Sequence, residues 1–567
     1  MKIDSSMRFM FSVLVLAAAS SMASAQAPAR PEAGSLMQQI EQGKPLRLPK
    51  VEAVPVPQPP EMAPQSGLSV TLSGMRFEGN HRLDSARLLE LMAHWLGRPL
   101  AFTDLQSAAA ALAQAYRTEG WVVRAYLPQQ TLESGVLTIR VVEAVMGEAR
   151  IESTAPVRVG ERRVRATVLA AQPSGQPMRS KDVDRAVLLL GDIPGISAKG
   201  SLAPGASDGE TDLVLNLTPQ PLLNGDVAID NTGSRSTGSN RISGGLYLNS
   251  PLRLGDQLAL NLLRTRGNRY ARVNFGLPVG YRGLRVGVSA SRLDYRVLGA
   301  DFATLGLNGG STITSLNLSY PMLRSQQANA YFGLEASQRR YDNVANSVSI
   351  SDYRLASLTA TASGNLSDTL GGGGSSSASL VLVRGRLDLS GSLNQPADAA
   401  GARTEGGYTV LRYGVTRYQV MTTSLSLYAS FSGQLANRNL DSSERIYLGG
   451  VSGVRAYPAS EAGGAEGSLF SLESRLQLPM NVMLTAFYDW GQVKVDEDNR
   501  FVGAAVINRL TLQGAGLSLA WVSSPNASFG LTWARRIGAN PHPTTTGQDQ
   551  DGTRDLNRFW LRTALAF

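Results

Sequence analysis

The chain has 567 residues, no cysteine and three histidines, and its charged fraction of 17% lies below the roughly 25% usual for soluble domains. Cysteine ligands are therefore excluded, and because the three histidines are scattered we expect no metal centre. The net charge of +9 comes without a basic run, which argues against a nucleic-acid partner. No stretch reaches the ~20 apolar residues of a membrane helix.

The first segment is typical of a secretory signal. Lys2 and Arg8 precede an apolar run over residues 9–19, and Ala23-Ser24-Ala25 follows. This order predicts a signal peptide over residues 1–25, with cleavage before Gln26. The run is too short to remain as a membrane anchor, so we expect the mature chain to be exported.

A short helix and a linker are expected next. In residues 26–43, the stretch 35–42 places Leu36, Met37 and Ile40 on one side of a helix. Residues 44–66 are rich in proline, which favours an extended linker of about 3.1 Å per residue.

Residues 67–145 and 146–221 are predicted to form two small α+β domains, each with the order βααββ. Gly97 and Gly120 stand where helices are expected to end. In the first domain the expected strands cover residues 68–77, 121–127 and 136–143, and the helices cover residues 85–96 and 103–119. The same pattern returns in the second domain and ends in a strand near residues 211–217.

Residues 222–567 alternate apolar and polar side chains with period two, in segments of about ten residues separated by turn residues. We count sixteen segments, with long connections after odd-numbered segments and short turns after even-numbered ones. This pattern predicts a transmembrane barrel of 16 antiparallel strands, with the apolar face toward lipid and the charged face toward a wet lumen. The segments begin near residues 223, 240, 257, 269, 284, 312, 327, 352, 376, 407, 423, 467, 482, 511, 525 and 557.

Several short motifs in the α+β region resemble those of POTRA domains in two-partner secretion transporters of the TpsB type. They are Gly79-Asn80, Tyr116-Arg117 before Gly120-Trp121, Leu127-Pro128-Gln129-Gln130, and Asp192-Ile193-Pro194-Gly195. Each motif alone would be an ordinary turn or helix end. Their common order carries the resemblance.

Two motifs in the barrel extend this resemblance. Val454-Arg455-Ala456-Tyr457 lies in a long loop over residues 436–466, and Phe487-Tyr488-Asp489-Trp490-Gly491 lies in a strand where period two puts Asp489 on the lumenal face if Tyr488 and Trp490 meet lipid. They are similar to the family's VRGY-type loop and F-x-D-x-G strand, except that Ala456 replaces a glycine and lacks its freedom at positive φ. The resemblance implies that the loop folds into the lumen and is locked by Arg455, Asp489, Val454, Tyr457, Phe487 and Gly491.

With Asp230-Asn231-Thr232-Gly233 and the terminal Phe567, the resemblance covers nearly the whole mature chain. The chain is identified as a member of the haemolysin secretion/activation (ShlB/FhaC/HecB-like) family of the POTRA-plus-barrel superfamily. Membership implies a membrane β-barrel in the bacterial outer membrane with periplasmic α+β POTRA domains. It implies export of a large TpsA-type exoprotein, of adhesin or haemolysin type, by two-partner secretion. It also implies that residues 26–43 plug the barrel, and that Phe567 is read by the barrel assembly machinery.

The βααββ order leaves one strand of a POTRA sheet as an exposed edge, which can pair with an extended substrate. We expect this edge at Trp121, Val122, Val123, Arg124, Ala125, Tyr126 and Leu127. Gly450-Val451-Ser452-Gly453 lacks the context of a nucleophile elbow, and we expect neither a cofactor nor an enzymatic activity. A passive porin or receptor, or a membrane-protein insertase of the same superfamily, remains an alternative.

Overall fold

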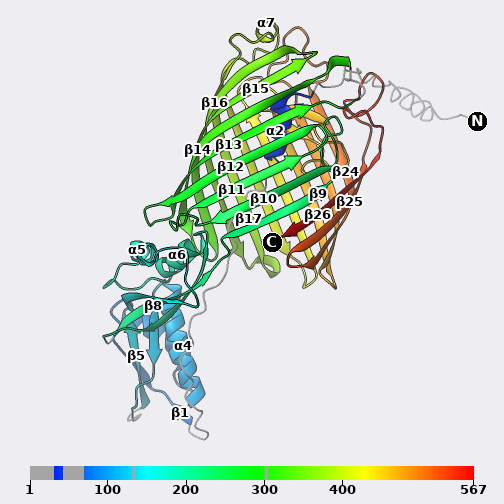
Figure 1. The fold of residues 1–567 in the computed structure, drawn as a ribbon. Helices are drawn as coiled ribbons and strands as arrows, with labels where there is room; N and C mark the ends of the chain where they lie inside the picture. The colour runs from blue at the N-terminus through cyan, green and yellow to red at the C-terminus, as the bar shows by residue number, and fades with distance from the viewer. Residues whose placement is uncertain (1–30, 43–68, 131–134, 208, 300–303) are drawn as a thin grey trace, which may run out of the picture.

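The computed structural model describes residues 31–42, 69–130, 135–207, 209–299 and 304–567. The predicted signal peptide and the proline-rich linker over residues 44–66 lie outside the described residues. The described chain forms an arm of two α/β domains below a closed barrel (Figure 1).

The first α/β domain is built on a three-stranded sheet with the order β2-β5-β4, packed against helices α3 and α4. Leu88, Leu112, Tyr116 and Ile139 are fully buried between sheet and helices. The elements are β1 (Ser69–Thr71), β2 (Gly74–Glu78), α3 (Ser85–Met92), β3 (Pro99–Ala101), α4 (Phe102–Thr118), β4 (Val123–Tyr126) and β5 (Val136–Glu143). Strands β1 and β3 form a separate antiparallel pair, which the sequence pattern did not predict.

The second domain repeats the plan as β6 (Val145–Ser153), α5 (Glu161–Ala171), α6 (Ser180–Gly191), β7 (Ile196–Pro204) and β8 (Glu210–Pro219), with the sheet order β6-β8-β7. It contacts the nearer end of the barrel. Arg324, at the end of β14, donates two hydrogen bonds of 2.8 and 2.9 Å to Asp192, and Arg185 of α6 donates to the Pro321 carbonyl. This end of the barrel is therefore the same end as the predicted periplasmic turns.

The barrel has sixteen antiparallel strands, as predicted, and it closes by pairing β26 with β9. Strands β14, β15 and β16 have 17, 18 and 21 residues, so the expected length of about ten residues is wrong there. The strands are β9 (Leu223–Asp230), β10 (Arg241–Asn249), β11 (Gln257–Arg264), β12 (Asn268–Val279), β13 (Leu284–Arg296), β14 (Asn308–Arg324), β15 (Ala328–Ala345), β16 (Val348–Asp368), β17 (Gly374–Asp388), β18 (Gly406–Val420), β19 (Leu425–Ala436), β22 (Glu466–Leu478), β23 (Val482–Lys494), β24 (Arg509–Ser524), β25 (Ala527–Arg536) and β26 (Asn557–Ala566).

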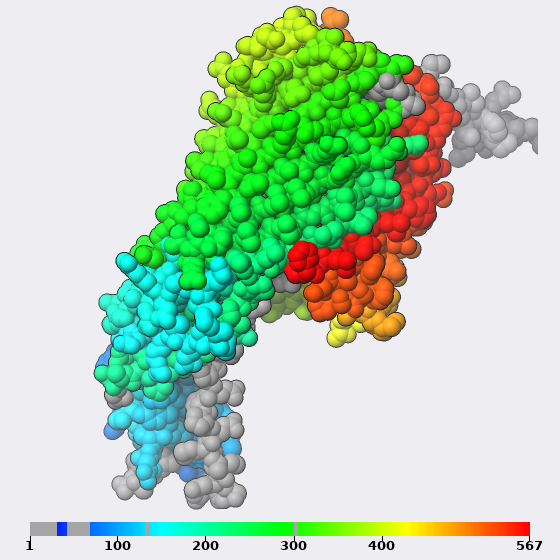
Figure 2. All heavy atoms as spheres, in the orientation of Figure 1, coloured from blue at the N-terminus to red at the C-terminus, as the bar shows by residue number. Residues whose placement is uncertain are grey.

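Alternation along the strands sorts the side chains between the two faces of the wall. Apolar residues such as Leu316, Leu358, Leu531 and Phe559 are exposed on the outer face, where lipid would cover them. The wall is continuous in the face seen in Figure 2. Among the described helices, none is long and apolar enough to cross a bilayer.

Two segments lie inside the barrel. Helix α2 (Ala33–Gln42) packs against β13, β14 and β15, and it begins two residues before the predicted helix (Figure 1). The loop over residues 436–466 also folds into the lumen and contains the short pair β20 (Ile446–Leu448) and β21 (Ala462–Gly464). A short helix, α7 (Gln395–Ala400), lies at the far end from the arm.

Candidate functional site: the occupied lumen

The loop places Arg455 on Asp489 of β23, which is the contact that the two motifs predict. Arg455 Nε and Nη2 donate to the two carboxylate oxygens at 2.8 and 2.7 Å, and the Arg455 backbone N–H donates to the same group at 3.1 Å. Asp489 is fully buried. A bidentate charge-assisted pair of this kind sets direction as well as distance.

Neighbouring groups make further hydrogen bonds and a ring contact with Arg455. Its Nη1 donates to Glu473 at 2.8 Å, and its Nη2 donates to Ser471 Oγ at 3.0 Å. The guanidinium lies over the Phe487 ring, 3.5 Å from its centroid. The Arg455 carbonyl accepts a bond from Trp560 Nε1 at 2.8 Å. Glu473 and Trp560 are contacts that the motif did not predict.

The other predicted locking residues form an apolar cluster beside this ion pair. Val454 and Tyr457 are fully buried with Leu448, Leu510 and Leu512, residues of the loop and of β24. Gly491 lies close to this cluster, because a Cβ there would meet Leu448 and Val454 side-chain atoms at 3.0 and 3.2 Å and require them to shift. The loop is therefore packed against the wall as well as ion-paired to it.

Ala456 faces Gly514 of β24. It is not among the described non-glycine residues with positive φ, so the expected loss of backbone freedom does not arise. The side chain at position 456 is limited by the space to the wall, since a Cβ on the facing Gly514 would lie 2.4 Å from the Ala456 Cβ. The residue pair that must stay small here is Ala456 and Gly514.

A second ion cluster holds the first half of the loop, and sequence reasoning missed it. Glu444 accepts 2.7 and 2.8 Å bonds from Arg339 of β15 and Arg412 of β18, and its side chain is only 1% exposed. Gln434 donates to the Glu444 and Ala465 carbonyls. Arg339 lies 105 residues from Glu444 in the chain, so no local pattern could have paired them.

The outer end of the loop contacts the connection between β25 and β26. Glu461 is 1% exposed and accepts a 2.9 Å bond from the Gln550 backbone N–H, while Asn540 bonds both Glu461 and Asp549. Burial, followed by the charge of Asp549, raises the pKa of Glu461 to about 8. Burial therefore favours the protonated form of this loop carboxyl.

Helix α2 contacts both the wall and the loop. Glu41 accepts from Tyr270 at 2.6 Å and from Arg272 at 2.9 Å, and the Ala33 N–H donates to Asn343 at 2.8 Å. Ser442 of the loop donates to Glu32 at 2.9 Å. Ala33, Leu36 and Met37 are buried against wall residues such as Leu293 and Tyr353.

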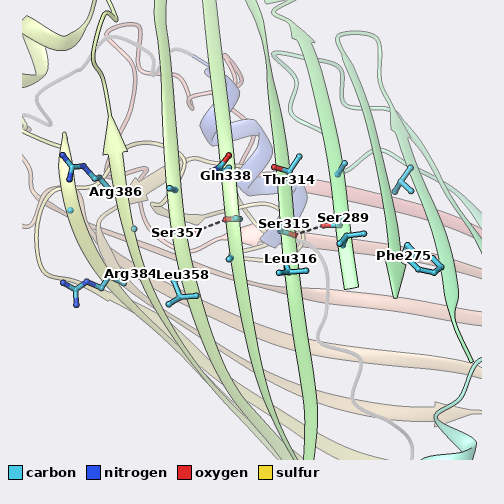
Figure 3. A pocket seen from close by; sticks show the side chains of 18 residues that line it. Phe275, Ser289, Thr314, Ser315, Leu316, Gln338, Ser357, Leu358, Arg384 and Arg386 are labelled. Carbon is cyan, nitrogen blue, oxygen red and sulfur yellow. Dashed lines mark hydrogen bonds between the residues drawn. The ribbon is translucent and has the colours of Figure 1, made fainter. Parts of the chain in front are cut away.

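Below α2, toward the arm, small hydroxyl side chains line part of the wall. Ser289 and Ser315 are hydrogen-bonded at 2.8 Å, and Ser337 and Ser357 at 2.9 Å (Figure 3). These four positions are consecutive neighbours across β13 to β16. A surface of satisfied hydroxyls offers weak, unspecific contacts to a passing chain.

The open edge strand is shorter than the predicted substrate edge over residues 121–127, because residues at both ends of the predicted edge have other contacts. Strand β4 is an edge strand, but it covers only Val123–Tyr126. Trp121 and Val122 instead join the two α/β domains: Val122 N–H donates to the Met178 carbonyl, and Trp121 lies between the guanidinium groups of Arg82 and Arg179. Leu127 packs partly buried against the domain core.

Phe567 lies at the seam where the barrel closes. Its backbone exchanges two 2.9 Å hydrogen bonds with Gly225 of β9, and its side chain is 61% exposed. Within the described residues, no cluster of three or more histidine, cysteine or carboxylate side chains could hold a metal ion.

A sixteen-strand barrel with an α/β arm and a locked lumenal loop defines an outer-membrane transporter of the POTRA-plus-barrel class. The family profile described as haemolysin secretion/activation protein ShlB/FhaC/HecB matches residues 209–518, and the ShlB-type POTRA domain matches residues 70–144. Because the first match spans more than half of the chain, the chain belongs to the ShlB/FhaC/HecB family of TpsB transporters.

Individual relatives agree with this membership. The heme/hemopexin transporter protein HuxB of Haemophilus influenzae is 25% identical over 95% of each chain. The outer membrane transporter CdiB of Dickeya dadantii is 26% identical over 75% of this chain and 77% of that protein. The solved structure of CdiB from Escherichia coli covers 90% of this chain and 93% of its own, with a TM-score of 0.66 at 23% identity, which supports the fold.

The chain therefore resides in the outer membrane, with its POTRA domains in the periplasm, and translocates a secreted TpsA-type protein from periplasm to cell surface. The end of the barrel away from the POTRA domains faces the cell exterior.

Proposed function

We propose that the secreted protein crosses the lumen after α2 has left it, while the loop over residues 436–466 keeps its contact with β23. The observation that supports this proposal is that the ion pair of the loop is more deeply buried than the ion pair of α2. The Asp489 side chain that holds the loop is 1% exposed, whereas Arg272 and Glu41, which hold α2, are 24% and 25% exposed. A partly hydrated ion pair is cheap to break, and a buried one is not.

The first contact with the secreted protein is assigned to the open edge of β4. Ala144 N–H donates to the Val122 carbonyl, and bonded pairs alternate along an antiparallel ladder, so the Val123 and Ala125 backbone groups point away from β5. An extended segment of the secreted protein can add a strand there.

Ala125→Pro tests this edge. Val123 is 7% exposed in the domain core, so proline at that position would damage packing, whereas Ala125 is half-buried. Ala125→Pro removes one edge donor and should reduce secretion at least tenfold, while Ala125→Ser, which keeps the N–H, should secrete normally. Both variants must first show equal barrel folding by heat-modifiable gel mobility. Normal secretion by the folded proline variant would contradict the edge.

The exported protein is proposed to be a large exoprotein of the adhesin or haemolysin type. The relatives named as a heme/hemopexin transporter and as a hemolysin transporter, HpmB of Proteus mirabilis, support this class. We assign no enzymatic step to the chain, and attribute net movement to folding of the exported protein outside the cell. Co-expression with the product of a neighbouring gene for a large repeat protein, followed by assay of the culture medium, tests the class.

We assign to Phe567 the role of a recognition signal during assembly of the barrel. A terminal aromatic that is exposed at the seam is placed to be read by the barrel assembly machinery before closure. Phe567→Ser should lower the amount of folded barrel in the outer membrane, whereas Phe559→Ser, which removes a similarly exposed aromatic of β26, should not.

A further inference from the structure

The outer face of the barrel carries a belt of arginines just beyond its apolar band, on the side toward the cell exterior. We read the outward-facing positions of six strands from the periplasmic end toward the exterior. In each strand, the first charged residue after the apolar positions is an arginine. The six are Arg264 of β11, Arg269 of β12, Arg292 of β13, Arg340 of β15, Arg354 of β16 and Arg384 of β17, and all are exposed.

Strand β17 shows the transition most clearly. Its outward positions run from Leu380 and Leu382, which are 50% and 48% exposed, to Arg384 and Arg386. Arg384 pairs across the sheet with Leu358, an exposed leucine of β16 (Figure 3). The arginines therefore stand directly at the upper border of the lipid-facing surface.

Some of the outward arginines make no hydrogen bond within the part of the chain that the structure describes, although Asp388 lies next to Arg354 and Arg386. Arg292 and Arg340 bond Asp294 and Asp352, but Arg354, Arg384 and Arg386 donate no hydrogen bond to any described residue. With Arg296 and Arg386 included, the outward faces of β11 to β17 present eight arginines near the exterior against four aspartates. This region has a surplus of positive charge.

The opposite half of the barrel lacks such a belt. At the corresponding ends of β23, β24 and β25 the outward cations are Lys494, Arg509 and Arg535, and Lys494 is already paired with Glu466 and Glu497. The surplus of positive charge is thus larger over β11 to β17 than over the opposite half of the wall.

We propose that this arginine belt binds the phosphate groups of the glycolipid that forms the outer leaflet. Guanidinium groups match phosphate oxygens in bidentate geometry. Their height, just above the leucines that meet acyl chains, is the height of a lipid headgroup. The occupant is a lipid rather than a free anion, because apolar and cationic contacts follow each other along the same strands.

Arg384→Gln/Arg386→Gln in the full chain tests the belt. Binding of fluorescent diphosphoryl lipid A in dodecyl maltoside micelles should weaken roughly tenfold or more, since each arginine near an anionic surface adds to affinity. Arg509→Gln/Arg535→Gln removes the same charge from the other half and should leave the affinity within about twofold of the parent chain. Equal heat-modifiable mobility of the variants establishes that each barrel is folded.

Two further binding measurements distinguish the phosphate of a lipid from free inorganic phosphate. Dephosphorylated lipid A should bind the parent chain and Arg384→Gln/Arg386→Gln equally weakly. Millimolar inorganic phosphate should not displace diphosphoryl lipid A; displacement would show an unspecific anion surface and overturn the proposal. Equal affinity of the parent chain and Arg384→Gln/Arg386→Gln for diphosphoryl lipid A would overturn it as well.

Discussion

The loop over residues 436–466 and helix α2 occupy the same lumen but are attached in opposite ways. The loop is anchored by Asp489 and Glu444, two carboxylates whose side chains are 1% exposed. Helix α2 is attached by Glu41 and Arg272, which are each about a quarter exposed. Under the proposed function, this difference in the burial of the ion pairs makes α2 the removable element and the loop the fixed one.

The energies of the two kinds of contact differ in the same direction. Truncating one member of a buried pair leaves an uncompensated charge and typically costs about 3–5 kcal/mol. A partly exposed pair is worth only about 1 kcal/mol or less. A helix of ten residues also has little stability of its own outside the barrel.

Loss of the Asp489 carboxylate should have the largest effect. Asp489→Ala removes the bidentate partner of Arg455 and leaves it only the Glu473 carboxylate, so it should destabilise the loop by about 2–3 kcal/mol, with a strong loss of secretion but an assembled barrel. Arg455→Ala should impair secretion in the same way, and the double variant should be little worse than either single variant. Additive losses among equally folded variants would show that the two residues act independently.

Glu444 should be nearly as important if the loop is held at both anchors. Glu444→Gln leaves Arg339 and Arg412 without their carboxylate and should loosen the first half of the loop by about 2–4 kcal/mol. Hydrogen exchange of residues 440–448 in the purified barrel measures this loosening. Glu466→Gln, which loses a half-buried contact with Lys494, provides the control and should exchange like the parent chain.

The contact between Ala456 and Gly514 can be broken and repaired. Gly514→Ala places two methyl groups at 2.4 Å and should cost about 1–3 kcal/mol through overpacking. Adding Ala456→Gly removes the opposing methyl and should restore most of the stability and secretion. If the double variant is no better than Gly514→Ala alone, the crowding comes from another neighbour, such as the Arg535 carbonyl.

Weakening α2 should affect conductance more than secretion. Glu41→Gln removes the charge that Arg272 and Tyr270 bind and should destabilise the docked helix by about 1 kcal/mol, which increases the open fraction several-fold. Deletion of residues 26–43 should give the full increase in planar-bilayer conductance with secretion largely intact. Unchanged conductance after deletion would show that α2 does not restrict the pore.

Glu461 should make the outer end of the loop sensitive to pH. Its pKa is raised from 4.5 to about 8 in the folded protein, so the folded state holds the additional proton and loses stability as the pH rises between these values. The thermal midpoint of the parent chain should therefore fall as the pH is raised from about 5 to about 8, and Glu461→Gln should flatten this slope. An unchanged slope in the variant would assign the dependence to another group.

One of the two loop anchors was predictable, from the period-two pattern together with the family resemblance. Period two placed Asp489 on the lumenal face if Tyr488 and Trp490 met lipid, and the resemblance to the family implied that Arg455 was its partner. Both signals are carried by a few adjacent residues. Glu444 carried no such signal, and its partners Arg339 and Arg412 were simply polar residues on the lumenal face of their strands. Trp121 was similarly assigned to an open edge, although its surroundings depend on Arg179 of the next domain.

The sequence by itself determined the order of domains, the number of barrel strands and the face to which each side chain points, since these properties depend on alternation and on turn residues close in the chain. The tertiary structure alone decided which lumenal residues meet. Strand stagger and barrel closure bring Glu444 to Arg339 and Ala456 to Gly514, and select the outward arginines of six strands for one border. Such proximity follows from the register of the whole closed sheet, which no local pattern encodes.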